Sequence, residues 1–174
     1  LVKARAFVAT RDEAQDLLGD ISGIKNPHRR DDAMATIITL LPKEQARRKI
    51  EEMTSDFYKV LALTLLGSED NLAAARLGAV NIKEQADHNY LKAEAWMLIA
   101  RVSGSSTDRK EAIRAAEKEW DKPLRIEYLA EAYSLTQEGI PTAQQMVFQL
   151  SDPFARACLY AAIGETSKRS EDFR

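Results

Sequence analysis

The sequence predicts an all-α protein, an α/α superhelix (solenoid) of about five two-helix repeats. Apolar residues recur at steps of three and four in nearly every segment, which places them on one face of a helix. No stretch alternates apolar and polar residues over more than a few positions, as a half-exposed strand would. Helix-start signals precede residues 27, 57, 89, 123 and 153, so the spacings are 30, 32, 34 and 30 residues.

These spacings define the expected organisation, a single helical-repeat domain over residues 1–174. At 174 residues the chain can bury a sizeable core and fits one domain on length alone. Leu1 is not an initiator methionine and Arg174 ends in mid-pattern, so we expect a piece of a longer chain. The expected units are a partial repeat 1–26, repeats 27–56, 57–88, 89–122 and 123–152, and a partial repeat 153–174.

The repeat at 89–122 has the clearest pattern. Its first helix is expected to span about four turns and to end in the Ser- and Gly-rich run 103–107. Ser106 or Thr107 then caps a second helix, and Pro123 opens the next repeat, because proline suits the first turn of a helix. The expected core positions are Ala93, Trp96, Met97, Ile99 and Ala100 in the first helix, and Ala112, Ile113, Ala116 and Trp120 in the second.

The remaining segments are looser copies of this unit. Thr10 and Glu13 form a capping box that starts a helix before Pro27. Pro42 marks the turn inside the second unit. The first helix of 57–88 is apolar on nearly all sides, which predicts a central position covered from two directions. Residues 167–174 are strongly polar, and we expect either a fraying tail or the start of another helix.

Composition and charge exclude several functional classes. The net charge of −2 gives no long-range field that would recruit nucleic acid or a membrane surface. No apolar run reaches the roughly 18–20 residues that a membrane span needs. The single cysteine, Cys158, excludes an internal disulfide, fits a cytoplasmic location and is expected to be a small buried or half-buried residue.

The unit at 89–123 resembles a tetratricopeptide repeat. That family places an aromatic, an aliphatic and a small residue in the first helix, an alanine in the second and a proline at the end. The resemblance extends partly to the units at 57 and 153 and implies a degenerate tetratricopeptide-like array. Ser103 stands where the family usually has a tyrosine, and HEAT-type repeats, with a longer period of ~40–47 residues, are the nearest alternative. The matching residues are Ala95, Trp96, Ile99, Ala100, Glu111, Ala112, Ile113 and Pro123.

The sequence contains no constellation typical of an enzyme. His28 and His88 lie two repeats apart, so we expect no shared metal or catalytic base. Carboxylate pairs such as Asp31 and Asp32 are common on solvated helix faces. No glycine-rich phosphate loop, HExxH or CxxC occurs. We therefore expect a non-enzymatic protein without a cofactor or metal.

The tetratricopeptide resemblance implies a groove lined by the first helices of the repeats. Groove positions lie two before, one after and five after the large first-helix residue, which selects Glu94, Met97 and Arg101 in the clearest unit. The other units contribute further positions, of which Asp32, Thr39, Tyr128 and Glu131 complete the predicted site. The remaining groove positions are Ala35, Leu61, Thr64, Ser68, Leu135, Cys158, Ala161 and Glu165.

The mixed apolar and acidic character of this strip predicts a protein-interaction scaffold that binds a peptide or an amphipathic helix. Arg29, Arg30, Arg47 and Arg48 keep a nucleic-acid-associated helical array open as an alternative, although acidic residues balance them. A helical domain of a larger enzyme or regulator is a further alternative. Self-association through open repeat ends is also possible, because uncapped repeats expose apolar faces.

Overall fold

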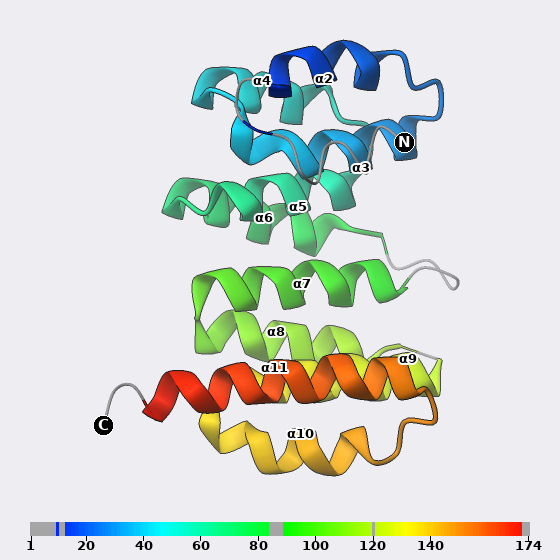
Figure 1. Cartoon of the computed structure of the whole chain (residues 1–174), viewed down its shortest axis with the longest axis vertical. Coiled ribbons are helices and arrows are strands. Elements are labelled where there is room, and N and C mark those ends of the chain that lie inside the picture. The colour runs from blue at the N-terminus through cyan, green and yellow to red at the C-terminus, as the bar shows by residue number, and fades with distance from the viewer. Residues whose placement is uncertain (1–9, 11–12, 84–88, 120, 172–174) are drawn as a thin grey trace. The chain divides into compact units, whose positions relative to one another are not determined.

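The computed structural model describes residue 10 and the ranges 13–83, 89–119 and 121–171. All secondary structure in these ranges is helical, which confirms the all-α prediction (Figure 1). The chain divides into two compact units, residues 1–82 and 83–174, and each is described by itself.

The first unit contains α2 (Glu13–Ser22), α3 (Pro27–Ile37), the 3-10 turn η1 (Ile38–Leu40), α4 (Lys43–Glu52), α5 (Asp56–Leu66) and α6 (Glu69–Asn81). The second contains α7 (Asn89–Ser103), α8 (Ser106–Glu117), α9 (Lys122–Ser134), the 3-10 turn η2 (Gln137–Gly139), α10 (Ile140–Val147) and α11 (Pro153–Glu171). Three pairs of consecutive helices pack against each other, namely α5 with α6, α7 with α8, and α9 with α10.

Short-range polar signals fix where the first helices begin. The Asn or Asp residue directly before α3, α9 and α11 accepts, through its side chain, a hydrogen bond from a backbone N–H in the first turn of the helix. A proline occupies the first or second position of each of these helices. The pairs are Arg29 N to Asn26 Oδ1 at 3.0 Å, Leu124 N to Asp121 Oδ1 at 2.9 Å and Phe154 N to Asp152 Oδ1 at 2.9 Å.

Two further helix starts refine the predictions. The capping interaction before α2 is present, because Glu13 Oε2 accepts from the Thr10 N–H and from Thr10 Oγ1, both at 2.8 Å. The start of α8 differs by one residue from the expectation. Ser105, rather than Ser106 or Thr107, accepts from the backbone N–H of Thr107 at 3.2 Å.

Glycines mark the turn inside two of the predicted units. Gly67 and Gly104 end α5 and α7 with φ of +67° and +64°, a conformation that other residues adopt at a steric cost. Gly67 follows α5 and so is not a small residue inside that helix. Close approach of α5 and α6 instead depends on Gly78, where an added Cβ would lie 2.7 Å from Val60 Cγ2.

The first unit is less enclosed than its composition suggests. Its core gathers buried side chains from α2 to α5, among them Leu17, Ile21 and Ile37. The apolar helix predicted at 57, α5, packs against α3, α4 and η1 as well as α6, whereas its Leu65 is exposed. Leu77 and Val80 of α6 are exposed as well.

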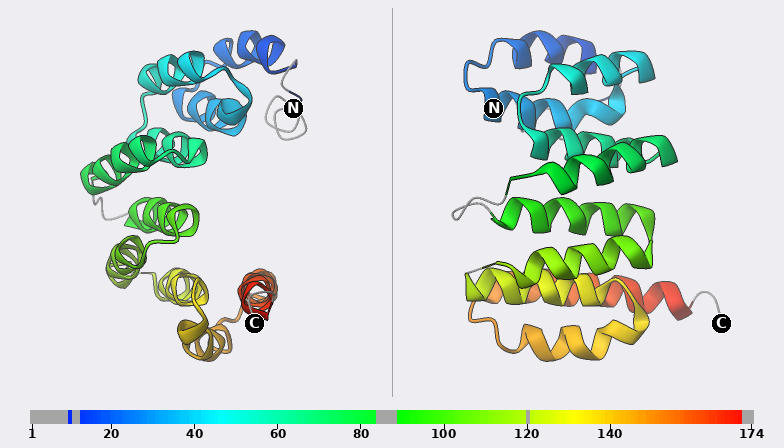
Figure 2. Two further views of the ribbon diagram at one scale, coloured as in Figure 1. Left: turned by 90° about the vertical axis from the view of Figure 1, so that its left-hand side faces the viewer. Right: turned by 180° about the vertical axis from the view of Figure 1, so that it is seen from behind.

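Two rows of helices build the second unit. Viewed along the helices in Figure 2, α7, α9 and α11 form one row, with α8 and α10 beside it. Trp96, Ile99 and Ala100 of α7 are buried, as expected, and small residues let α8 pack closely on α7. These small residues of α8 are Ala112, Ala115 and Ala116. Trp120 lies outside the described residues.

The last helix runs further than the pattern suggested. α11 continues without a break to Glu171, so residues 167–171 neither fray nor start a new helix. The hydroxyls of Thr166 and Ser167 donate to the carbonyls of Ala162 and Ile163, as in a continuous helix.

Candidate functional site

The seven predicted site residues fall in both units. In the first unit, Asp32 is half-buried in α3 and Thr39 is exposed in the 3-10 turn η1. The second unit holds Glu94, Met97 and Arg101 on α7, and Tyr128 and Glu131 on α9.

Met97 does not fit the role that the groove geometry gave it. Its side chain is 3% exposed, so a partner cannot reach it without displacing the core. Its neighbour Leu98 is half-buried and lies on the more accessible side of α7. Glu94 and Arg101 are exposed, as a groove position requires.

The remaining four residues of the second unit lie in two pairs across α7 and α9, which pack against each other. Arg101 and Glu131 form an ion pair between the helices. Glu94 interacts electrostatically with Tyr128, and so does Tyr90, which lies one turn before Glu94. We call these five residues the α7–α9 strip: Tyr90, Glu94, Arg101, Tyr128 and Glu131.

Tyr90 was not among the predicted positions. It lies in the first turn of α7, four residues before Glu94. Residues four apart are neighbours on a helix surface, so this spacing could have identified Tyr90 from the sequence. Its inclusion extends the strip toward the N-terminal ends of α7 and α9.

Burial and negative charge both act on Tyr128. Burial, followed by the charges of Glu94, Glu127 and Glu119, raises the pKa of the Tyr128 phenol well above its ordinary value. The phenol therefore stays neutral, with a hydroxyl that can donate a hydrogen bond. Burial, and then the charge of Asp152, also raises the pKa of Glu127.

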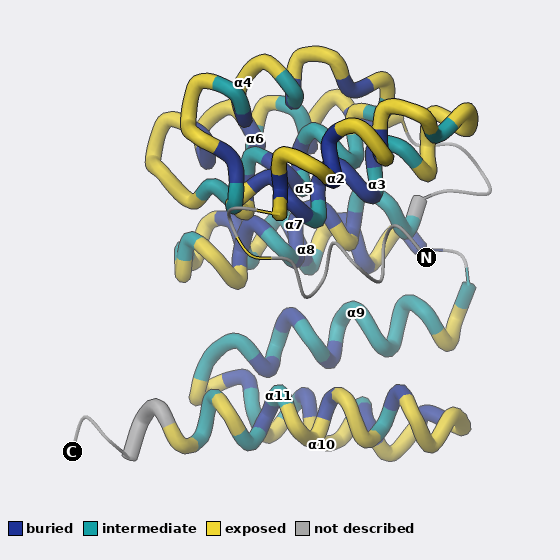
Figure 3. The backbone as a smooth tube through the Cα atoms, turned by 45° about the horizontal axis from the view of Figure 1, so that its top comes forward, coloured by how far each residue is buried: buried dark blue, intermediate teal, exposed yellow. Residues whose placement is uncertain are grey.

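The helix α9 keeps accessible surface although it packs on four other helices, α7, α8, α10 and α11. All six residues from 124 to 129 are half-buried, which Figure 3 shows as an almost continuous teal stretch. In an ordinary two-layer helix the residues alternate between buried and exposed sides. Side chains of α9 therefore remain within reach of a bound molecule next to the α7–α9 strip.

A buried carboxylate lies close to this strip. Glu119, in the link between α8 and α9, is 2% exposed, and its Oε1 accepts from the backbone N–H of Asp121 at 3.0 Å. Its Oε2 accepts no hydrogen bond from the part of the chain that the structure describes. Sequence reasoning missed Glu119, because nothing in the residue pattern distinguishes it from an exposed linker glutamate.

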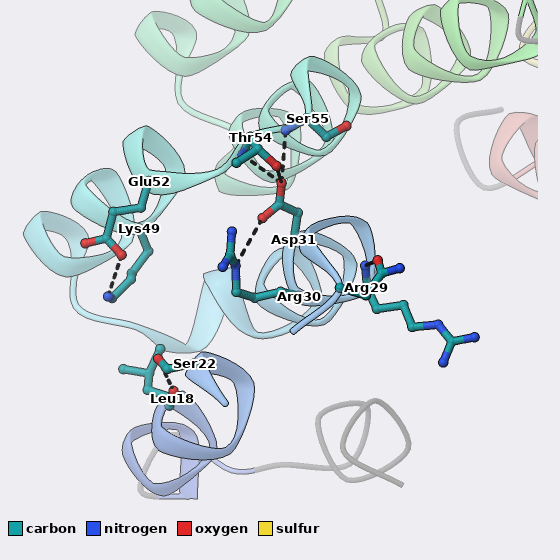
Figure 4. Close-up of polar contacts among 10 residues, drawn as sticks. Leu18, Ser22, Arg29, Arg30, Asp31, Lys49, Glu52, Thr54 and Ser55 are labelled. Carbon is teal, nitrogen blue, oxygen red and sulfur yellow. Dashed lines mark hydrogen bonds and ion pairs between the residues drawn. The ribbon is translucent and has the colours of Figure 1, made fainter. Parts of the chain in front are cut away.

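The first unit contains a small polar cavity of about 220 Å³ between α2, α3 and α4. Figure 4 shows that its charged groups lie in pairs: Lys49 bonds to Glu52 at 2.7 Å, and Arg30 Nε lies 3.8 Å from Asp31 Oδ1. The cavity therefore presents no excess of either charge. Its lining residues are Ser22, Arg30, Asp31, Met34, Lys49, Glu52 and Met53.

Asp31, at the edge of this cavity, has a structural role. Its Oδ2 accepts three hydrogen bonds, from Thr54 N at 2.7 Å, Thr54 Oγ1 at 2.9 Å and Ser55 N at 2.9 Å (Figure 4). These bonds attach the link between α4 and α5 to α3. Asp31 is 1% exposed, so it does not fit the solvated carboxylate pair that the sequence suggested.

An apolar surface lies on α10 and α11. Phe148 is 75% exposed, Phe154 76% and Tyr160 42%, and the rings of Phe148 and Tyr160 meet edge to face at 6.4 Å between centroids. Cys158 is exposed, which corrects the expectation of a buried or half-buried residue. Ala157 and Ala161 are exposed on the same side of α11 as Cys158.

His28 belongs to no metal-binding cluster among the described ranges, 13–83, 89–119 and 121–171. His28 is exposed, and His88 lies outside these ranges. No cluster of three His, Cys, Asp or Glu residues with metal-binding geometry occurs within them.

None of the described helices combines the length and the apolar character that crossing a membrane requires.

Comparison of the chain with protein-family models, with curated protein sequences and with solved structures finds no match in any of the three. The α7–α9 strip and the apolar surface on α10 and α11 are therefore two features of the molecule that bear on its function.

Proposed function

We propose that this chain is a non-enzymatic interaction scaffold, a tetratricopeptide-like α/α solenoid that binds a peptide or helix of another protein along the α7–α9 strip. The observation that carries the proposal is the pairing of four predicted groove residues across two adjacent first helices. Groove surfaces of helical-repeat proteins are built in this way, from corresponding faces of successive helices.

The chemistry of the strip supports a peptide ligand. Two tyrosines supply aromatic surface with a polar end, the kind of side chain that contributes most at protein interfaces. Glu94, Glu131 and Arg101 supply charges that orient a partner and accelerate its association. The half-buried residues 124–129 of α9 offer the additional apolar contact that a bound helix or extended segment needs.

The test begins with a phage-displayed library of random 12-residue peptides, selected on the full chain of 174 residues. Arg101→Glu and Glu131→Arg are each expected to weaken the selected peptides about tenfold, equivalent to roughly 1.4 kcal/mol. The double exchange restores an ion pair between α7 and α9 with the charges swapped. Binding should remain weak in that variant, because the partner still meets reversed charges.

Arg114→Glu provides the matched control. Arg114 is an exposed arginine of α8 that pairs with Glu111 of its own helix, outside the strip. Binding by isothermal titration calorimetry should be unchanged in this variant. Equal affinity for the wild type and for both strip variants would contradict the proposal.

A second candidate function is self-association through the apolar surface on α10 and α11. Repeat spacing places Trp96, Ala130 and Tyr160 at equivalent positions of α7, α9 and α11. Trp96 and Ala130 are buried, and their helices pack against α8 and α10, whereas Tyr160 is exposed. Because the exposed residues Phe154 and Ala157 have side chains that carry no charge, two copies can meet there without like-charge repulsion between them.

Light scattering coupled to size-exclusion chromatography tests self-association. The wild-type mass is expected to rise from monomer toward dimer with loading concentration, and Tyr160→Ser combined with Phe148→Ser should abolish the rise. Leu77→Ser, which removes an exposed apolar side chain of the first unit, should leave the rise intact. A wild-type chain that stays monomeric up to millimolar concentration would contradict this candidate.

A further inference from the structure

The polar cavity of the first unit is large enough to admit a small molecule. Its walls come from α2, α3, α4 and the link after α4, and its volume is about 220 Å³. One water takes about 30 Å³ in the liquid, so the cavity has room for several waters or for one small organic molecule. Sites for drug-sized ligands are larger, about 300–1,000 Å³. The size of the cavity therefore favours a ligand of few heavy atoms.

Four of the side chains that line this cavity can be reached from solvent. Ser22 is exposed, and the exposed fractions of the Arg30, Lys49 and Glu52 side chains are 35%, 24% and 62%. The groups available to a ligand are therefore one hydroxyl, two cations and one carboxylate. The other three lining residues are buried and form only the wall: Asp31, Met34 and Met53.

The reachable groups keep hydrogen-bonding capacity that the fold does not use. Arg30 Nε lies 3.8 Å from Asp31 Oδ1, which is too far for a hydrogen bond. The guanidinium N–H groups of Arg30 therefore have no acceptor within the described part of the chain. Glu52 bonds to Lys49 through Oε2 at 2.7 Å, which leaves Oε1 as an acceptor (Figure 4). The cavity thus offers a planar set of donors together with a free acceptor.

The charges around the cavity sum to zero. Arg30 and Lys49 are cations, whereas Asp31 and Glu52 are anions. A ligand with a single charge of either sign would leave the cavity with a net charge, and partial burial makes an unbalanced charge costly. A ligand with one charge of each sign keeps the sum at zero. Its anionic group matches the free donors of Arg30, and its cationic group matches the free acceptor of Glu52.

We propose that this cavity binds a free α-amino acid in its zwitterionic form. The ligand carboxylate accepts hydrogen bonds from the Arg30 guanidinium, whose planar fork matches a carboxylate, while the ligand ammonium donates to Glu52 Oε1. Lys49 stays bonded to Glu52 and holds that side chain in place. The cavity lies in the first unit and the α7–α9 strip in the second, so binding of an amino acid does not depend on the proposed function.

Other ligand classes fit this cavity poorly. An apolar molecule would remove water from charged groups without replacing its hydrogen bonds. A metal ion needs several His, Cys or carboxylate ligands at short distance, and the structure shows no such cluster over the residues it describes. An anion alone, such as phosphate or the acidic side chain of a peptide, brings no donor for Glu52 Oε1 and adds an unbalanced charge.

Three matched ligands test the proposal by titration into the full ¹⁵N-labelled chain at neutral pH. L-Norvaline carries both charges, pentanoate lacks the ammonium and butylamine lacks the carboxylate. We expect norvaline to shift the backbone amides of residues 22, 30, 49 and 52, with saturation in the millimolar range. Pentanoate and butylamine should each bind about tenfold more weakly, because each lacks one charge-assisted hydrogen bond. No shift with norvaline, or equal affinity for either of the other two ligands, would overturn the proposal.

Two variants assign each charge of the ligand to its partner in the cavity. Arg30→Gln removes the guanidinium and should weaken norvaline and pentanoate alike, each by about tenfold. Glu52→Gln removes the carboxylate and should weaken norvaline by a similar factor without weakening pentanoate, because only the ligand ammonium uses Glu52. Norvaline affinity that is unchanged in Glu52→Gln would contradict the proposed contact.

Arg29→Gln and Glu51→Gln provide the matched controls. Both residues are exposed neighbours of the two tested positions and lie outside the cavity lining, and Figure 4 shows Arg29 extending away from Glu52. Each control makes the same chemical change one residue earlier and should bind norvaline as the wild type does. Thermal unfolding of every variant verifies that the fold is intact. A control that weakens norvaline as much as its tested neighbour would overturn the assignment of the site to this cavity.

Discussion

Replacing Asp31 with alanine is expected to lower the free energy of unfolding by about 2–3 kcal/mol. The substitution removes the acceptor of three hydrogen bonds, from Thr54 N, Thr54 Oγ1 and Ser55 N. Breaking them leaves two backbone N–H donors without their partner. Each unpaired, partly buried donor costs about 1–3 kcal/mol, and a hydrogen bond to water recovers part of this cost. The link between α4 and α5 loses its attachment to α3.

Two milder variants separate the contributions of the individual hydrogen bonds to the free energy of unfolding. Asp31→Asn keeps an acceptor oxygen, and Thr54→Val removes one hydrogen bond only, so each should cost about 1 kcal/mol. Urea unfolding is followed by far-UV circular dichroism, because both tryptophans of the chain lie in the second unit and do not monitor α3 directly. Ordinary surface substitutions change the free energy of unfolding by up to ~0.5 kcal/mol. If Asp31→Ala lowered this free energy by less than ~0.5 kcal/mol, the structural role of the carboxylate would be contradicted.

The second large effect is expected at Trp96. Its side chain is 6% exposed on α7, so truncation to alanine both removes buried apolar surface and leaves a cavity. Substitutions of this kind cost about 3–5 kcal/mol in protein cores. We therefore expect Trp96→Ala to be more destabilising than the other substitutions considered.

Trp96→Phe is the matched control, because it retains an aromatic ring and should recover more than half of the loss. Unfolding is measured in urea by circular dichroism and, in the variants, by the fluorescence of the remaining tryptophan. A cost below about 1 kcal/mol for Trp96→Ala, the centre of the distribution for all single substitutions, would show that Trp96 is not a core residue.

Local chemistry explains why the helix boundaries were predictable. An Asn or Asp followed by proline satisfies the exposed N–H groups of a helix start within a few residues, so the signals at Asn26, Asp121 and Asp152 needed no tertiary information.

Burial was less predictable, since it depends on which helices surround a position. Met97 and Cys158 were both placed in the predicted groove, yet Met97 is buried and Cys158 is exposed. The first helix of 57–88 was expected to be covered from two directions, and α5 packs against α3, α4 and α6, yet its Leu65 is 40% exposed. Periodicity identifies the face of a helix and leaves open how completely a neighbour covers it.

The candidate site was predictable in part for the same reason. Glu94, Arg101, Tyr128 and Glu131 were expected from the resemblance to tetratricopeptide repeats, and the structure joins Arg101 and Glu131 in an ion pair. Glu119 did not follow, because its burial and the unused Oε2 arise from packing of the link between α8 and α9.

The most direct test of the account is amide hydrogen exchange of the full chain with and without a selected peptide. Binding along the α7–α9 strip predicts added protection in α7 and α9, at residues 90–101 and 124–131, with little change in α8 and α10. Protection confined to α8, α10 or the first unit, with α7 and α9 unchanged, would contradict the claim that this strip is the binding surface.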